Sequence, residues 1–179
     1  MQADLKLTTE RLILRPLLEE DAKQIYLYCS DRDIADTTFA IPHPYSLKDA
    51  ENFISYSSNK LKSEDEYNFA IICKKKLKLI GVIGLITFKQ HERAELGYWI
   101  GKPNWGKGYC TEAAKELISF AFEVLKLNKV HSSHILRNPA SGKVMQKIGM
   151  KHEGRIRQHI KKWDKFEDAD FYGILKNEA

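Results

Sequence analysis

The sequence contains no hydrophobic run long enough to cross a bilayer, and its opening MQADLKLTTERL lacks the apolar core of a signal peptide. Cysteine is scarce: Cys29, Cys73 and Cys110 are widely spaced and odd in number, which fits neither a disulfide framework nor a metal-binding pattern. The H-E-x-x-H motif of zinc enzymes is missing as well. These absences argue against a membrane-spanning protein, a disulfide-stabilised secreted domain and a zinc enzyme. We therefore expect a protein of the reducing cytoplasm that binds neither metal nor membrane.

Strong charge of one sign is also lacking. The chain has 29 lysines and arginines against 24 aspartates and glutamates, a formal net charge of +5, with the two signs interspersed. This mild excess suits a phosphorylated ligand but is too small to predict specific binding of nucleic acid. The length of 179 residues fits one domain with a full-sized core. Because no repeat, low-complexity segment or Pro/Gly-rich linker interrupts it, we expect a single domain over residues 1–179.

Hydrophobic periodicity predicts an α/β protein. Strands are predicted over residues 11–15, 68–73, 79–89, 94–100, 130–136, 151–160 and 168–175. Helices are predicted over 19–30, from 46 onward, and over 111–127 and 138–148. The three strands between residues 68 and 100 are joined by short charged turns, so we expect an antiparallel meander. The order of elements is β-α-α-β-β-β-α-β-α-β-β, with a largely antiparallel first half.

The segment GKPNWGKGYCTEA, residues 101–113, stands between a predicted strand and a predicted helix. Its glycines fit an ordinary turn, and they also fit phosphate binding. A nucleotide P-loop is disfavoured because Gly108 replaces the Ser or Thr that contacts Mg²⁺, and Thr111 breaks the dinucleotide motif G-x-G-x-x-G. A pyrophosphate cradle without metal remains, in which backbone N–H groups and the positive end of the following helix hold a diphosphate such as that of coenzyme A. Gly106 and Gly108 leave room for the backbone and the ligand, and Lys107 adds positive charge.

With these residues the chain resembles the GNAT superfamily of N-acetyltransferases, and within it the RimJ/RimL-type branch, which acetylates protein N-termini. The resemblance covers almost the whole chain and lies in LTTERLILRPL at the start, PYSLKDAENFI at 44–54, AELGYWIGKPNWGKGYCTEA at 94–113 and NPASGKVMQKIGMKHEG at 138–154. It implies the GNAT acyl-CoA N-acyltransferase fold, a mixed and mostly antiparallel central sheet flanked by helices, with acetyl-CoA as cofactor. Pro103 stands where the superfamily has Gln or Arg, a loss shared by many members of the branch. Met145 stands where many members have a proton-donating tyrosine, which puts a tyrosine-based mechanism in doubt.

The resemblance also implies which residues bind the coenzyme. The pantetheine arm is expected at Tyr98, Trp99 and Ile100, the thioester end at Asn138 and Ser141, and the pyrophosphate at Trp105, Gly106, Lys107, Gly108, Tyr109, Cys110 and Thr111. Asn138 suits a helix N-cap equally well. Cys110 is expected to pack as a small apolar side chain, because the family transfers acetyl directly.

Acetyl transfer to an amine requires a neutral amine, a donor for the oxyanion and a proton for the departing thiolate. A backbone N–H near the end of the 94–100 strand is our candidate for the donor. The resemblance points to Ser141 as the acid, and the alternative is that Ser141 only lines its helix. Glu95 is our candidate base, directly or through water; the alternatives are a solvated charge or an ion-pair partner of Arg93.

The sequence leaves the amine acceptor open. The branch favours a protein N-terminal α-amine, a small-molecule amine (polyamine, antibiotic or metabolite) is the alternative, and a non-catalytic module that binds coenzyme A or associates with RNA is the rival from another class. Segments 37–44 and 163–168 are expected to build the acceptor pocket, with His43 inside the first of them. His131 and His134 are three apart on a strand and face opposite ways, so they cannot share a metal. A homodimer is compatible with the resemblance, since homodimers are frequent in the family.

Overall fold

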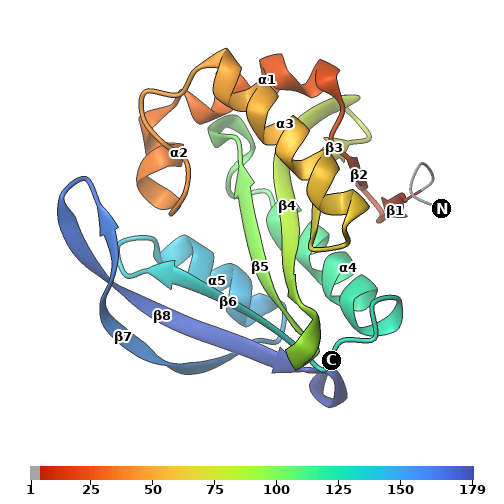
Figure 1. The fold of residues 1–179 in the computed structure, drawn as a ribbon, viewed down its shortest axis with the longest axis vertical. Helices are drawn as coiled ribbons and strands as arrows, with labels where there is room; N and C mark the ends of the chain where they lie inside the picture. Colours follow the sequence, from red (N-terminus) through yellow and green to blue (C-terminus); the bar gives the residue numbers. More distant parts are fainter. Residues whose placement is uncertain (1–4) are drawn as a thin grey trace.

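A computed structural model describes residues 5–179 as one eight-stranded sheet with helices on both faces (Figure 1). The strands are β1 (Leu7–Thr8), β2 (Leu12–Pro16), β3 (Glu66–Cys73), β4 (Lys78–Phe88), β5 (Arg93–Ile100), β6 (Lys129–Ile135), β7 (Lys151–Lys162) and β8 (Lys165–Leu175). The helices are α1 (Ala22–Cys29), α2 (Arg32–Thr37), α3 (Leu47–Lys62), α4 (Tyr109–Glu123) and α5 (Pro139–Lys147). No helix in this part of the chain is long and apolar enough to cross a bilayer.

The sheet has the order β1-β2-β3-β4-β5-β6-β8-β7. Its first five strands pair antiparallel, which confirms the predicted meander, and the mixed, mostly antiparallel sheet confirms the predicted fold class. Short turns suffice for these strands because antiparallel neighbours need no crossover.

The sheet opens between β5 and β6. These two strands form the single parallel pair among the described strands, and they pair over only three residues each, Arg93–Glu95 with residues 129–131. Directly after this stretch the hydroxyl of Ser132 donates a 2.7 Å hydrogen bond to the carbonyl of Leu96, in place of a continued strand ladder. Beyond that point the two strands diverge (Figure 1), so the upper part of β5 has no neighbouring strand on its β6 side.

Two apolar cores cover the two faces of the sheet. Strand alternation sends Phe69 and Leu85 toward α4, where Leu117 is fully buried. Ala70 and Val82 point the other way, against α1 and α3. Burying one such leucine side chain contributes roughly 1.5–3 kcal/mol, so the cores fix the sheet from which the site is built.

The sequence prediction misses two elements, β1 and α2, and makes the two strands β7 and β8 too short. Strand β1 is too short for any pattern, and α2 has only six residues, begun by the Asp31 side chain, which accepts from the Asp33 N–H. Strands β7 and β8 form a long hairpin whose turn residues, Trp163 and Asp164, both have positive φ. Such a turn normally uses Asn-Gly or Asp-Gly, so this sequence carries no hairpin signal. The predicted strand 151–160 therefore ends before the turn is reached, and the predicted strand 168–175 begins after the turn has already passed.

Candidate active site

A cleft of about 1030 Å³ lies where β5 and β6 separate. One side of it is built from β5, α4, α5 and the loop between β5 and α4, and the other from α3, β3, β4 and the segment after α2. All thirteen residues singled out in the sequence line it: Glu95, Tyr98, Trp99, Ile100, Trp105, Gly106, Lys107, Gly108, Tyr109, Cys110, Thr111, Asn138 and Ser141. The fold therefore brings together segments that are up to 46 residues apart, from Glu95 to Ser141.

The loop before α4 has the backbone shape that its glycines suggest. Gly106 and Gly108 have φ values of 72° and 76°, and Gly108 is the N-cap of the 15-residue helix α4. A Cβ added at Gly106 would meet no atom within 4 Å, so glycine is favoured there by the positive φ and not by a lack of space. The loop leaves open space in front of this residue. Lys107 folds back, because its Nζ donates to the carbonyl of Pro103 at 2.6 Å.

Residues of the turn between β1 and β2 hold this loop, through contacts that no local sequence pattern predicts. Glu112, in the first turn of α4, accepts hydrogen bonds from the Thr9 hydroxyl and from the backbone and Nε of Arg11. Arg11 also donates to the carbonyl of Lys107 at 3.0 Å and lies over the ring of Tyr109. Burial alone would raise the pKa of Glu112, but the hydrogen bonds from Thr9 and Arg11 lower it, so the carboxylate stays charged.

The loop is anchored on its other side as well. Asn104 is 2% exposed; its side chain accepts from Lys76 Nζ at 2.6 Å and donates to Tyr28 Oη at 3.3 Å. The Trp105 indole donates to the carbonyl of Ile100. These contacts fix the path of the chain from β5 to α4.

Tyr98 and Ser141 form a hydroxyl pair inside the cleft. The Tyr98 oxygen lies 2.9 Å from the Ser141 hydroxyl and 3.0 Å from its carbonyl. Burial raises the pKa of Tyr98, so its hydroxyl remains protonated and can donate. Asn138 caps α5 by accepting from the Ser141 N–H at 3.3 Å, and it also donates to the carbonyl of Thr37 at 3.0 Å. Met145 is fully buried.

Glu95 lies on the opposite face of β5 from Tyr98, because the two are an odd number of residues apart. Its side chain is half-buried, and burial raises its pKa, with a smaller opposing effect of Arg93. Arg93 is no ion-pair partner of Glu95 in the described chain; its guanidinium contacts His131 Nε2 at 2.5 Å and the Phe88 ring. Glu95 thus lies in the cleft, at the edge of the opening between β5 and β6, with the Tyr98–Ser141 pair on the other face of β5.

His131 and His134 pack against other side chains of the fold. Burial and the nearby Arg93 lower the pKa of His131 to about 4. His134 is buried, stacks on Tyr172 and lies so close to Gly142 that a Cβ there would be 2.5 Å from its Nε2. Within residues 5–179 no three potential metal-ligating side chains come together.

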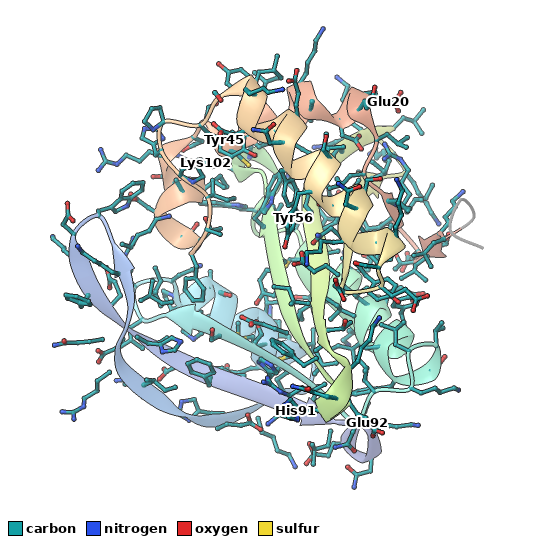
Figure 2. All side chains as sticks on the ribbon, in the orientation of Figure 1. Glu20, Tyr45, Tyr56, His91, Glu92 and Lys102 are labelled. Carbon is teal, nitrogen blue, oxygen red and sulfur yellow. The ribbon has the colours of Figure 1, made fainter. Side chains whose placement is uncertain are left out.

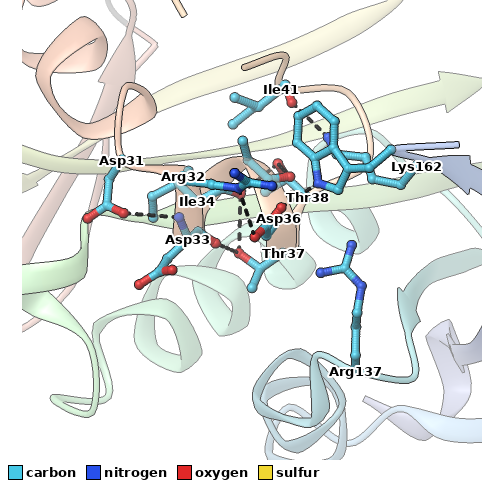
Figure 3. Close-up of polar contacts among 12 residues, drawn as sticks. Asp31, Arg32, Asp33, Ile34, Asp36, Thr37, Thr38, Ile41, Arg137 and Lys162 are labelled. Carbon is cyan, nitrogen blue, oxygen red and sulfur yellow. Dashed lines mark hydrogen bonds and ion pairs between the residues drawn. The ribbon is translucent and has the colours of Figure 1, made fainter. Parts of the chain in front are cut away.

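The structure corrects one expectation about the acceptor side. Residues 37–42 line the cleft, but His43 and the hairpin segment 163–168 do not. The hairpin instead holds the cleft-lining segment (Figure 3): Lys162, which is 7% exposed, donates to the carbonyls of Ile41 at 2.7 Å and Phe39 at 3.3 Å. Trp163 lies beyond it, donates to the Asp36 carboxylate and packs edge-on against His43. Residues 163–168 do not line the cleft because they belong to the β7–β8 hairpin, which the sequence does not predict. The hairpin contacts the cleft-lining segment on its side away from the cleft.

Comparison with known proteins gives a consistent result. The family model described as "Acetyltransferase (GNAT) domain" matches residues 11–151. The chain is 32% identical to the uncharacterized N-acetyltransferase p20 of Bacillus licheniformis over 96% of its own length and 97% of the relative. It is 39% identical to the putative ribosomal N-acetyltransferase YdaF of Bacillus subtilis over 56% of this chain and 55% of that one. A crystal structure of a GNAT-family acetyltransferase from Bacillus anthracis superposes with a TM-score of 0.87 at 26% identity, covering 97% of this chain and all of the other.

Proposed function

The chain belongs to the GNAT acetyltransferase family and is an acetyl-CoA-dependent N-acetyltransferase, and on that premise we propose that its acceptor is the α-amine at the N-terminus of a protein. The observation that carries the proposal is the character of the candidate base at the cleft. This candidate is a half-buried carboxylate, Glu95, whereas His134, the one histidine that lines the cleft among the described residues, stacks on Tyr172 and contacts the carbonyl of Ile135 through Nδ1. A carboxylate is a weak base even when burial raises its pKa. An α-amine, with a pKa of about 7.7–8.0, needs far less help to become neutral than a lysine-like amine at about 10.4. The similarity to a putative ribosomal N-acetyltransferase supports the same acceptor class.

The residues of the cleft fit coenzyme A. Open space in front of Gly106, the two positive-φ glycines at 106 and 108 and the N-terminus of α4 leave backbone N–H groups and partial positive charge for a diphosphate. The uncovered edge of β5 beyond Glu95 suits the pantetheine arm, beside Tyr98, Trp99 and Ile100. Bound acetyl-CoA supplies the thioester whose acetyl group is transferred.

The chain's own residues would then manage two protons. Glu95 accepts the proton of the acceptor ammonium, directly or through water, on the α3 side of β5. On the other side, the Ser141 hydroxyl would give a proton to the departing thiolate, and Tyr98 at 2.9 Å would orient that hydroxyl. The second proton, which the nitrogen loses as the amide forms, restores the Ser141 hydroxyl by way of solvent, so that one proton is released in each turnover. Backbone N–H groups on the free edge of β5 are placed to stabilise negative charge on the carbonyl oxygen.

Mass spectrometry of a reaction with a mixed acceptor panel tests the acceptor. The panel holds short peptides with different N-terminal residues, polyamines and common amine metabolites, and each is incubated with acetyl-CoA and either the wild-type chain or the Gly106→Glu variant. We expect one acetyl on the α-amine of at least one peptide, and none with the variant. Acetylation of small amines alone would move the function to small-molecule modification.

A further inference from the structure

We propose that Glu66 binds a cationic group of the acceptor, so that the preferred acceptor carries a second positive charge near the amine that is acetylated. The inference rests on the proposed function and adds a specificity-determining residue and a substrate class to it: an N-terminal peptide with a basic side chain within its first residues.

Glu66 and Glu95 belong to one row across the sheet. The strand register pairs Glu66 of β3 with Ile86 of β4, and Ile86 with Glu95 of β5, so the three side chains leave the same face of the sheet. Two strand spacings place the Cα atoms of the glutamates roughly 9–10 Å apart. All three residues line the cleft.

The floor next to Glu95 is apolar and open at Ile86 and Gly97, whereas the Asn68 side chain covers Gly84. Ile86 is 43% exposed although it lies in the middle of the sheet. In the neighbouring row Gly84 and Gly97 stand side by side with no side chains. A Cβ at Gly84 would lie 2.1 Å from the amide oxygen of Asn68, whereas a Cβ at Gly97 would meet nothing within 4 Å. Such a floor suits the carbon chain of an acceptor that has a charged group at each end.

Glu66 differs from the other buried carboxylates of the described chain. Asp21 is paired with Arg15 at 2.7 Å, and Asp170 with Arg155 at 2.8 Å. Glu66 is equally buried, at 9% exposure, yet its hydrogen bonds come from two neutral groups, the Tyr56 hydroxyl and the Asn68 amide at 3.3 Å.

A buried carboxylate without a cation is unfavourable unless a ligand supplies one, and a carboxylate has more acceptor sites than these two bonds use. Tyr56, labelled in Figure 2, reaches Glu66 from α3 and fixes its orientation at the cleft. The missing cation is the group that we assign to the acceptor.

The charged side chains that line the cleft form a basic end and an acidic end. Lysines lie at the end built by α4 and α5, at positions 107, 143 and 147, and carboxylates lie at the other end, at positions 49, 66 and 95. Cations near the acidic end already have other partners: Arg93 contacts His131, Lys162 donates to two carbonyls, and Lys60 pairs with Asp65 and lies over the Tyr56 ring. An anionic coenzyme and a cationic acceptor therefore meet complementary ends.

The test compares acceptors that differ only in the second charge. Tetrapeptides carry lysine or norleucine at position one, two or three, and 1,4-diaminobutane is compared with 1-aminopentane, all at saturating acetyl-CoA. The enzymes are the full-length wild type, Glu66→Gln, and the control Glu64→Gln, which makes the same change on a side chain that is 63% exposed, outside the cleft.

We expect at least one lysine peptide to have a kcat/KM about 10- to 100-fold above its norleucine partner, the ratio that a charge-assisted hydrogen bond supplies. Glu66→Gln should reduce that ratio to about 1–3, with the loss falling on the lysine peptides and not on acetyl-CoA affinity, and Glu64→Gln should behave as wild type. Wild-type turnover without any preference, or a preference that survives Glu66→Gln, overturns the assignment of Glu66 and leaves the N-terminal transferase standing. A Glu66-dependent preference for the diamine without peptide turnover supports the assignment of Glu66 and overturns the N-terminal transferase. Absence of turnover on the whole panel overturns both.

Discussion

Replacing Lys162 with methionine removes the ammonium that holds the cleft-lining segment after α2 against the β7–β8 hairpin. Lys162 is buried, and its Nζ donates to the carbonyls of Ile41 and Phe39, 2.7 Å and 3.3 Å away. Methionine keeps the apolar stem and its packing but has no donor. The prediction is a selective loss of acceptor binding.

The magnitude follows from the two bonds. Hydrogen bonds to a charged group contribute about 1.5–3 kcal/mol, and part of this is offset by the burial of the ammonium, which lowers the pKa of Lys162. A net weakening of segment closure by about 2 kcal/mol corresponds to an upper limit of about 30-fold in acceptor KM. The KM for acetyl-CoA should stay within about twofold of wild type, because the loop before α4 lies at the other end of the cleft and keeps all its contacts.

Steady-state kinetics with each substrate varied in turn provide the assay, together with limited proteolysis by chymotrypsin. Opening of the segment should speed cleavage after Phe39. The adjacent Lys161→Met is the matched control, since that side chain is 56% exposed and pairs with Asp164 in the hairpin turn. The reasoning is refuted if both KM values rise together, or if Lys162→Met changes neither acceptor KM nor cleavage after Phe39.

Three further variants address the coenzyme loop and the two proton-transfer groups. Gly106→Glu places a carboxylate in the pyrophosphate loop, so calorimetry should show acetyl-CoA affinity reduced at least about tenfold, with a stability loss limited to the roughly 1–2 kcal/mol of a side chain at positive φ. Ser141→Ala should lower kcat by about 10- to 100-fold at unchanged acetyl-CoA affinity, and a parallel loss of both would make Ser141 a binding residue instead. Because burial raises the pKa of Glu95, wild-type kcat/KM should fall as pH drops through a value above the ordinary 4.3 or so, where the base becomes protonated. Glu95→Gln should be slower and lack that acid limb; an unchanged pH profile would remove Glu95 from the mechanism.

Local patterns predicted the parts of the molecule that local physics determines. The meander follows from alternation and short turns, and the coenzyme loop follows from glycines whose positive φ the structure requires. The position of the thirteen predicted catalytic and coenzyme-binding residues at the cleft also follows, because the ends of β5, α4 and α5 meet where the sheet opens.

Local sequence patterns could not predict the contacts between segments that are distant in the sequence. Arg11 and Glu112 are 101 residues apart, and nothing in either neighbourhood marks the pair. Lys162 is one lysine in a basic run, and only the hairpin around the positive-φ turn at Trp163 shows that it points inward. Glu66 likewise stands in the polar run 62–66, and only the strand register shows that it lies in line with Glu95.

The separation of Glu95 from the Tyr98–Ser141 pair depends on the geometry of strand β5. Glu95 and Tyr98 are three residues apart on β5, so they project to opposite faces, and the candidate base and the Tyr98–Ser141 pair lie on different sides of the backbone. That separation is useful only where β6 is absent, since a continued ladder would close the passage between the faces. The pairing stops after Glu95, and the Ser132 hydroxyl takes the carbonyl of Leu96 immediately afterwards. A one-residue slip of β5 would exchange the two faces and put the carboxylate among the buried residues under α4, so the register of β5 is as much a part of the site as the side chains themselves.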